Sequence, residues 1–387
     1  MGGLYLHIPF CKSYCNYCDF YSETKLASKS ALVAAIIKEA AFRRDFFKEL
    51  KEKVSTLYFG GGTPSLLSAG EIGMIVKELS DVFETDLTNP SIEFTIEANP
   101  DDLIPEYLTQ LRRVGVNRLS IGFQSFFDEH LKWMNRRHDS KQALQAFKNA
   151  REAGFDNISA DLIFGFSLLS IEQWREEVRQ IVELKPEHVS AYQLSIEPNS
   201  KLGREYERGK YTPVSDEDSL REYEYLRREL TNSGYNHYEI SNFALPTKES
   251  KHNSSYWNRT PYLGLGPGAH SYNRERRFWN IPDLKNYSAF FNNENNSKAD
   301  TPFEEEVLTK ADILNERVML SLRMVEGMDL EALKNEFAGK LSGELISNIK
   351  SALSKGFLVE QRGKIKIPPE KLFVSDGIIR DLFVETD

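Results

Sequence analysis

The first two-thirds of the chain alternates short apolar runs with longer stretches whose apolar residues recur at helical spacing. The apolar runs predict six strands, at Gly3–Ile8, Thr56–Phe59, Ile92–Glu97, Arg118–Phe123, Ile158–Phe164 and Val189–Leu194. Between them, five amphipathic stretches predict helices, at Ala31–Lys51, Ala69–Val82, Glu106–Val114, Lys141–Ala153 and Ile171–Leu184. This repeat predicts an α/β fold with a parallel sheet, either partly closed as a barrel or flat and doubly wound.

The alternation stops after Tyr235, and two further segments follow. Residues 236–300 are rich in histidine and aromatic residues, which form either a face for a flat aromatic ligand or a cover over the sheet edge. Residues 301–387 then predict helices followed by a small hairpin, which is typical of a winged-helix module. The predicted elements are helices at Glu304–Met324, Leu330–Phe337 and Gly343–Lys355 and strands at Phe357–Gln361 and Lys364–Ile367. We therefore predict three units, at 1–235, 236–300 and 301–387.

Charge and hydropathy narrow the functional classes. The chain has 49 lysines and arginines against 58 aspartates and glutamates, a formal net charge of −9. Nucleic-acid binding needs a clustered basic surface, and the winged-helix-like segment has no basic recognition helix, so we expect no nucleic-acid partner. No apolar run approaches the ~20 residues of a membrane helix. The N-terminus lacks the pattern of a signal peptide, so we expect a cytoplasmic protein.

All three cysteines of the chain fall within eight residues. Cys11, Cys15 and Cys18 are spaced Cys-x3-Cys-x2-Cys directly after the first predicted strand. Three thiolates on one loop would hold three corners of a cubane iron–sulfur cluster and leave one iron open for a substrate, whereas such clusters usually have four cysteine ligands. The alternatives are a zinc site with His7 as fourth ligand, or three incidental thiols.

Polar residues stand at or near the carboxyl ends of the next predicted strands, where α/β folds bind their ligands. Gly60–Ser65 follows the second strand, Glu97 ends the third, and Gln124 follows the fourth. Asp161 lies inside the apolar fifth strand, where burial without a partner would be costly. The glycines form either a tight turn or a ligand-binding loop. Glu97 is either a surface carboxylate or an acceptor for a ligand amine, and Asp161 either contacts a ligand or forms a salt bridge.

Together these motifs resemble the radical S-adenosylmethionine (SAM) proteins. Those at Tyr5–Cys11, Gly60–Ser65, Ile96–Pro100, Leu119–Ser125 and Asp161–Ile163 are similar to the oxygen-independent coproporphyrinogen oxidase family, and the resemblance covers essentially the whole chain. It implies a partial (β/α)6 barrel with a C-terminal helical, winged-helix-like module. It also implies a 4Fe-4S cluster on Cys11, Cys15 and Cys18, whose open iron binds SAM.

The resemblance also implies a set of SAM contacts. They are Tyr5, Tyr17, Gly61, Gly62, Thr63, Glu97, Gln124, Arg136 and Asp161. Glu97 suits the methionine amine, Arg136 suits its carboxylate, and Tyr17 would pack on the adenine. The chain departs from the family pattern at two places: Asn135 stands before Arg136 in place of a more common glycine, and Phe166-Ser167-Leu168 replaces Leu-Pro-Gly after Gly165.

Two branches of this family differ at positions that can be compared with this chain. The oxidase branch has a fourth cysteine where this chain has Phe20, and a long extension where only ten residues precede Cys11. Cys15–Phe20 and His252–Trp257 instead resemble the HemW-type haem chaperones. That branch implies haem as cargo and delivery to respiratory membrane proteins. The alternative is the oxidase reaction, radical decarboxylation of coproporphyrinogen III.

Further expectations concern haem and the surroundings of the protein. His252 is the candidate haem contact, because imidazole is a common axial ligand; the alternative is that it packs within the fold. The resemblance raises a homodimer and a peripheral position at the inner membrane face as open alternatives. The residues identify no electron donor, and they leave open whether SAM is turned over.

Overall fold

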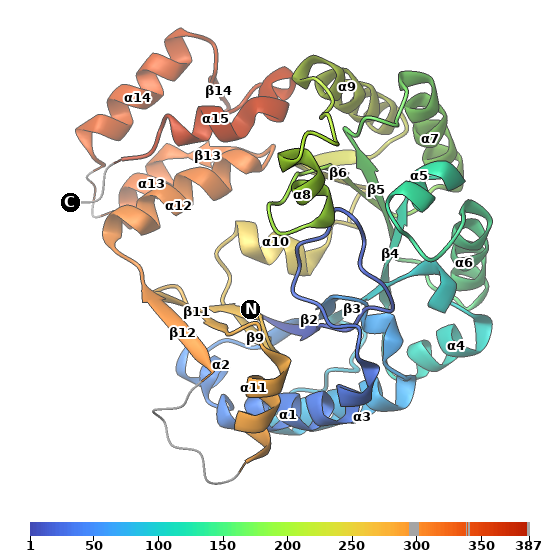
Figure 1. Ribbon diagram of the computed structural model, residues 1–387. Coiled ribbons are helices and arrows are strands. Elements are labelled where there is room, and N and C mark those ends of the chain that lie inside the picture. The colour runs from blue at the N-terminus through green and yellow to red at the C-terminus, as the bar shows by residue number, and fades with distance from the viewer. Residues whose placement is uncertain (294–301, 338, 340, 385–387) are drawn as a thin grey trace.

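The computed structural model describes residues 1–293, 302–337, 339 and 341–384. Its centre is a curved sheet of parallel strands (Figure 1). These are β1 (Gly2–Ile8), β2 (Val54–Gly61), β3 (Glu93–Ala98), β4 (Arg118–Gln124), β5 (Ile158–Phe164) and β6 (His188–Gln193). All six lie within a residue or two of the predicted strands.

The helices between the strands cover the outer side of this sheet (Figure 1). They are α1 (Lys29–Phe42), α3 (Ala69–Val82), α4 (Pro105–Arg113), α6 (Ser140–Glu152) and α7 (Ile171–Leu184), with the shorter α2 (Phe46–Glu49) and α5 (Asp128–Trp133). The predicted helix over Ala31–Lys51 is wrong in its middle, because it ends at Phe42 and resumes as α2 after a turn.

The order of the strands decides between the two predicted architectures. β1 to β6 are neighbours in sequence order with no reversal. Crossovers between parallel strands are right-handed, so an unbroken order places every helix on the same side and curves the sheet. A doubly wound sheet would need a reversal to place helices on both faces. The fold is therefore a partial (β/α)6 barrel, and the sheet does not close.

Alternate residues of the strands face opposite sides of the sheet. The side under the helices is apolar and forms the core, with buried Leu57, Phe59, Phe94, Ile96, Leu119, Ile121, Leu162 and Phe164. The concave side is polar. It carries Thr56, Tyr58, Thr95, Glu97, Arg118, Ser120, Ser159 and Asp161. A filled barrel would have an apolar interior, so this polarity indicates an interior that meets a ligand.

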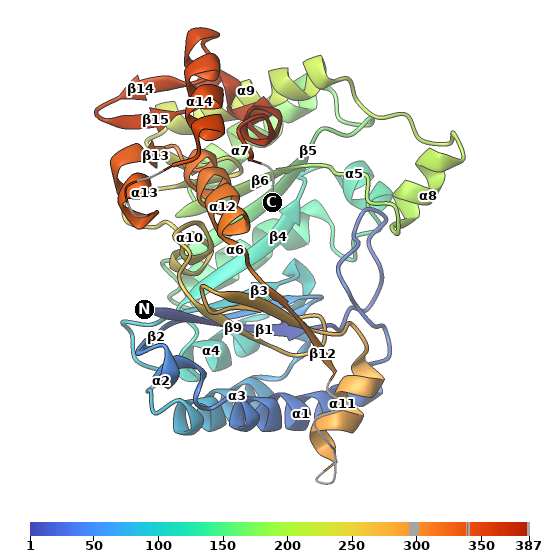
Figure 2. The ribbon, with the colours of Figure 1, turned by 90° about the vertical axis from the view of Figure 1, so that its left-hand side faces the viewer.

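The segment after β6 extends both edges of the sheet. β7 (Asn236–Glu239) and β8 (Asn242–Ala244) continue it beyond β6, while β9 (Tyr262–Leu265) pairs with β1 and leads to β10 (His270–Tyr272) and β11 (Arg276–Asn280). Between the two edges, α10 (Lys251–Trp257) contacts β1 and β2. Beside the barrel lie α8 (Lys201–Glu207), α9 (Asp216–Asn232) and α11 (Leu284–Asn292) (Figure 2).

The predicted helix over Glu304–Met324 is wrong at its start. Residues Phe303–Val307 form β12, which pairs with β11 and ends the large sheet. The helix α12 (Lys310–Arg323) begins later because Thr309 caps it, together with Asp312 in a capping box. The boundary that we placed between residues 300 and 301 lies outside the described residues.

The C-terminal part has the predicted order of helices and hairpin. The helices after α12 are α13 (Leu330–Glu336), α14 (Gly343–Ser354) and α15 (Ser375–Arg380), and a small sheet accompanies them. The small sheet consists of β13 (Met328–Asp329), β15 (Lys364–Lys366) and β14 (Val359–Gln361). Within the described ranges, no helix combines the length and apolar character needed to cross a membrane.

Candidate functional site

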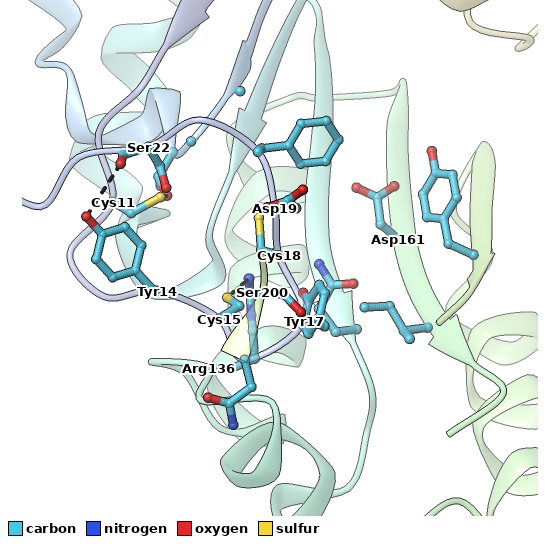
Figure 3. A pocket seen from close by; sticks show the side chains of 18 of the residues that line it. Cys11, Tyr14, Cys15, Tyr17, Cys18, Asp19, Ser22, Arg136, Asp161 and Ser200 are labelled. Carbon is cyan, nitrogen blue, oxygen red and sulfur yellow. Dashed lines mark hydrogen bonds between the residues drawn. The ribbon is translucent and has the colours of Figure 1, made fainter. Parts of the chain in front are cut away.

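A cavity of about 1250 Å³ opens at the carboxyl ends of the barrel strands. Single-ligand pockets span roughly 300–1,000 Å³, so this one has room for more than one small ligand. Most of the predicted site residues line it: Cys11, Cys15, Tyr17, Cys18, Gly61, Gly62, Thr63, Glu97, Gln124, Arg136 and Asp161. Tyr5 and His252 are not among the lining residues. The parallel strands thus bring together side chains that lie up to 150 residues apart in the sequence (Figure 3).

The cysteine loop is held at its base and at its tip. At the base, the backbone N–H of Cys11 donates to the carbonyl of Glu23, and that of Glu23 donates to the carbonyl of Pro9. At the tip, Asn16 is bonded through its backbone to Met134 and to Leu202 of α8. The loop therefore sits against the β4–α6 connection and α8, as Figure 2 shows.

The three thiols lie around one part of the cavity and are partly buried (Figure 3). Thr63 Oγ1 lies 3.6 Å from Cys11 Sγ, and Arg136 Nη1 lies 3.3 Å from Cys15 Sγ. Burial raises the pKa of Cys11, and it raises the pKa of Cys18 to about 11. These thiols become thiolates readily only when a cationic group is bound to them.

His7, the fourth ligand of the zinc alternative, is placed elsewhere. Its ring contacts Tyr5 Oη at 3.2 Å through Nδ1 and the carbonyl of Tyr21 at 2.9 Å through Nε2, and it does not line the cavity. Among the described residues, no group of three histidine, cysteine or acidic side chains is arranged to hold a metal ion. A cubane cluster spreads its thiolates over separate iron atoms, so it does not require the three thiols to converge on a single ion.

The glycine loop, Gly60–Ser65, packs against the backbone segment that leads into the cysteine loop. Gly61 has φ +107°, which favours glycine, and its backbone N–H donates to Glu97 Oε2 at 3.1 Å. A Cβ on Gly62 would lie 2.8 Å from the carbonyl oxygen of Phe10 and 2.9 Å from that of Ile8. These glycines therefore allow two backbone segments to approach closely just before Cys11, and they line the cavity as well.

Glu97 is a buried carboxylate on the cavity wall. One oxygen accepts from Tyr58 Oη at 2.8 Å and the other from the N–H of Gly61. Burial raises the pKa of Glu97 to about 7, and the negative charge of Asp161 adds to this shift. An ammonium group in the cavity would favour the ionised form, so Glu97 fits the role of amine acceptor. Tyr5 lies behind this wall, where its hydroxyl contacts His7.

Asp161 is buried with partners of its own. Its oxygens accept from Ser120 Oγ at 2.9 Å and from Ser159 Oγ at 3.0 Å, and no basic side chain within the described ranges forms a salt bridge with it. Burial raises the pKa of Asp161. Its place on the cavity wall favours the ligand alternative over the salt-bridge alternative.

Arg136 reaches the cavity from the loop before α6. Besides Cys15, its guanidinium donates to Asn99 Oδ1 and, at 3.2 Å, to the carbonyl of Gly122. Asn135 before it has φ +59°, a conformation that asparagine tolerates better than most side chains, which explains why the family pattern has glycine there. The Asn135 amide also donates to the carbonyl of Tyr14 at 2.7 Å, so this departure leaves the loop geometry intact.

His252 is buried at the opposite end of the barrel strands. Its Nδ1 contacts Thr56 Oγ1 at 2.8 Å, its Nε2 contacts Tyr256 Oη at 2.9 Å, and its ring stacks on Tyr58. Burial lowers the pKa of His252 to about 3. Haem ligation would require one of these hydrogen bonds to break, so the placement favours the packing alternative; ligation stays a prediction. Asn253, the next residue of the His252–Trp257 motif, does line the cavity.

Asn99, at the end of the third predicted strand, lines the cavity and accepts from the guanidinium of Arg136, a contact that the sequence does not reveal. Sequence reasoning missed Arg118, which also lines the cavity. The signal for Arg118 was available: a charged residue at an inward position of a buried strand is costly unless a partner meets it.

Comparison with known proteins gives the class first. Residues 5–184 match the Radical SAM superfamily, and residues 308–374 match the HemN C-terminal domain. Among solved structures, Escherichia coli coproporphyrinogen III oxidase (HemN), titled a radical SAM enzyme, superposes with a TM-score of 0.83. The match covers 99% of this chain and 90% of that one, at 24% identity, and it confirms the fold.

Full-length relatives give the particular family. The heme chaperone HemW of Lactococcus lactis is 32% identical over 99% of this chain and 98% of its own length. That of Bacillus subtilis is 34% identical over 92% and 93%, and that of Escherichia coli is 37% identical over 69% of each chain. The chain belongs to the HemW family of radical SAM proteins. Membership in the superfamily implies a 4Fe-4S cluster and SAM, and the three partly buried free thiols and the polar cavity that they line fit both groups.

Proposed function

We propose that this protein is a haem chaperone that carries a SAM-coordinated 4Fe-4S cluster and delivers haem to respiratory membrane proteins. The relation to HemW proteins over nearly the whole chain is the observation that carries this proposal. Phe20, where the oxidase branch has a fourth cysteine, supports it from the residues. The agreement in fold with the oxidase HemN is compatible with either branch, because one fold hosts several activities.

The roles of the residues follow from their placement. Cys11, Cys15 and Cys18 would hold the cluster, and Glu97 and Arg136 would hold the amine and carboxylate of SAM. When bound, the cluster supplies the Lewis-acidic iron and the single electron that SAM chemistry needs. Arg136 would orient SAM while its contact with Cys15 keeps the thiol in place.

The test is an anaerobic assay of the protein reconstituted with iron and sulfide. It is supplied with SAM, a reductant and coproporphyrinogen III, while haem is titrated in parallel and its transfer to a haem-free respiratory cytochrome is followed. We expect stoichiometric haem binding, haem transfer, and no protoporphyrinogen. Catalytic formation of protoporphyrinogen would establish the oxidase reaction instead. Colourless protein with one zinc per chain would support the zinc alternative and overturn the cluster assignment.

A further inference from the structure

Arg118 is a buried arginine without a side-chain partner among the described residues. It is the first residue of β4 and points to the concave side, with only 1% of its surface exposed. Its side chain forms no hydrogen bond or ion pair with any residue that the structure describes, and its Nε is a buried donor without an acceptor. A guanidinium has five donors and stays charged, so burial without a partner is strongly unfavourable.

The side chain lines the floor of the cavity. Ser120, two residues along the same strand, donates to Asp161, and the charge of Arg118 contributes to the lowered pKa of His188 and of His252. Asn253 of α10 also lines the cavity, and its side-chain amide has no hydrogen-bond partner among the described residues. Arg118 and Asn253 therefore bring unused polar groups to one cavity.

Two buried carboxylates, Asp161 and Glu97, are influenced by the charge of Arg118 but do not pair with it. The oxygens of Asp161 accept from Ser120 and Ser159, and those of Glu97 accept from Tyr58 and Gly61. The two carboxylates influence Arg118 only at longer range. The hydrogen-bonding capacity of the guanidinium is thus left for a ligand that enters from the cavity mouth.

We propose that Arg118 binds a carboxylate group of the ligand that fills this cavity. A guanidinium binds a carboxylate through two parallel hydrogen bonds, which a lysine cannot reproduce. A singly charged carboxylate is favoured over a phosphate, because Asp161 and Glu97 would repel a doubly charged group more strongly. Given the proposed function, in which Arg136 holds the carboxylate of SAM, we assign this carboxylate to a haem propionate.

The experiment compares haem with haem dimethyl ester, whose propionates carry no charge. Reconstituted wild-type protein and its Arg118→Gln, Arg118→Lys and Arg204→Gln variants are titrated with each porphyrin and, separately, with SAM. Arg204 is the matched control, because it is an exposed arginine at the cavity mouth whose guanidinium donates to the carbonyl of Asn199. Iron content and the thermal unfolding midpoint are recorded for every variant, so that loss of fold is recognised.

We expect wild-type protein to bind haem roughly tenfold or more tightly than the ester, and both Arg118 variants to lose this preference. Loss of SAM affinity in both variants, with the haem preference unchanged, would instead assign the carboxylate to SAM. Full rescue of binding by Arg118→Lys would overturn the proposal, since charge alone would then suffice. Unchanged binding of all ligands in Arg118→Gln would also overturn it, because no ligand would then need the guanidinium. If wild-type protein binds neither porphyrin, the proposed function fails, and the SAM titrations still test Arg118.

Discussion

Nη1 of Arg136 lies 3.3 Å from Sγ of Cys15, although the two residues are 121 positions apart in the sequence. The same guanidinium also donates to Asn99 Oδ1 and to the carbonyl of Gly122. One side chain thus joins the cysteine loop to β4 and to the loop after β3. This contact ties the position of a cluster ligand to the position of a residue that would bind SAM.

Replacing Arg136 should affect the affinity for SAM more than the stability of the fold. We expect Arg136→Lys to weaken SAM binding at least about tenfold, because lysine cannot make the parallel hydrogen bonds of a guanidinium. Equilibrium binding of SAM to reconstituted protein measures this. Arg137→Lys is the neighbouring control, since Arg137 forms ion pairs with Asp101 and Asp102. Equal affinity in wild-type and Arg136→Lys protein would remove Arg136 from the SAM site.

The cysteines can be tested without interference, because the chain has no others. We expect Cys11→Ala to lose most of its iron and sulfide, the absorbance near 400 nm and any SAM cleavage together. Ser13→Ala, between Cys11 and Cys15 on the same loop, should retain all three. An intact four-iron cluster in Cys11→Ala would show that this thiol is not a ligand.

Glu97 predicts a pH dependence of SAM binding. Its pKa is raised to about 7, so the carboxylate is largely protonated below that pH and ionised above it. Because the ionised form would accept the SAM ammonium, affinity should rise with pH and fall by up to about tenfold per unit well below 7. Titrations from pH 5.5 to 7.0 keep most of the ammonium charged. Glu97→Gln should bind weakly with a flat profile; an unchanged slope in that variant would assign the dependence to another group.

Gly62 is expected to tolerate no side chain. A Cβ there would lie under 3.0 Å from backbone atoms of Ile8 and Phe10, which cannot move without displacing Cys11. We expect Gly62→Ala to lose about 2–3 kcal/mol of unfolding free energy and to bind less iron. Gly70→Ala in α3, whose nearest added contact is 3.9 Å, should be neutral or slightly stabilising. Urea unfolding and iron analysis compare the two, and similar behaviour of both variants would contradict the close approach.

Variants of His252 and Tyr256 distinguish a packing role of His252 from haem ligation. Tyr256→Phe removes only the hydroxyl that contacts His252 Nε2 and should cost about 1 kcal/mol of stability. His252→Ala also removes the stack on Tyr58 and the contact with Thr56, so we expect about 3 kcal/mol. Absorption spectra of bound haem decide whether His252 is an axial ligand. If His252 is an axial ligand, His252→Ala changes the Soret band; an unchanged spectrum and affinity would confine it to packing.

The strands and the cysteine site were predictable from sequence because their signals are local. Apolar runs of four to seven residues predicted β1 to β6 to within two residues, and parallel strands place their carboxyl ends at one edge. That rule alone brings Glu97 and Asp161 to the cysteine loop. The start of the C-terminal helix was not predictable in this way, because Phe303–Val307 becomes a strand only by pairing with β11.

By itself the sequence determined the repeating strand and helix units, the three-thiol motif, and the side chains that gather at the cavity. Only the tertiary structure decided that the sheet curves into a partial barrel, that Tyr5 and His252 do not line the cavity, and that Arg118 meets no partner among the described residues. The reason is physical. Periodicity tells which side of a strand a residue faces, but the groups that meet it there come from distant strands whose register and curvature are set by packing.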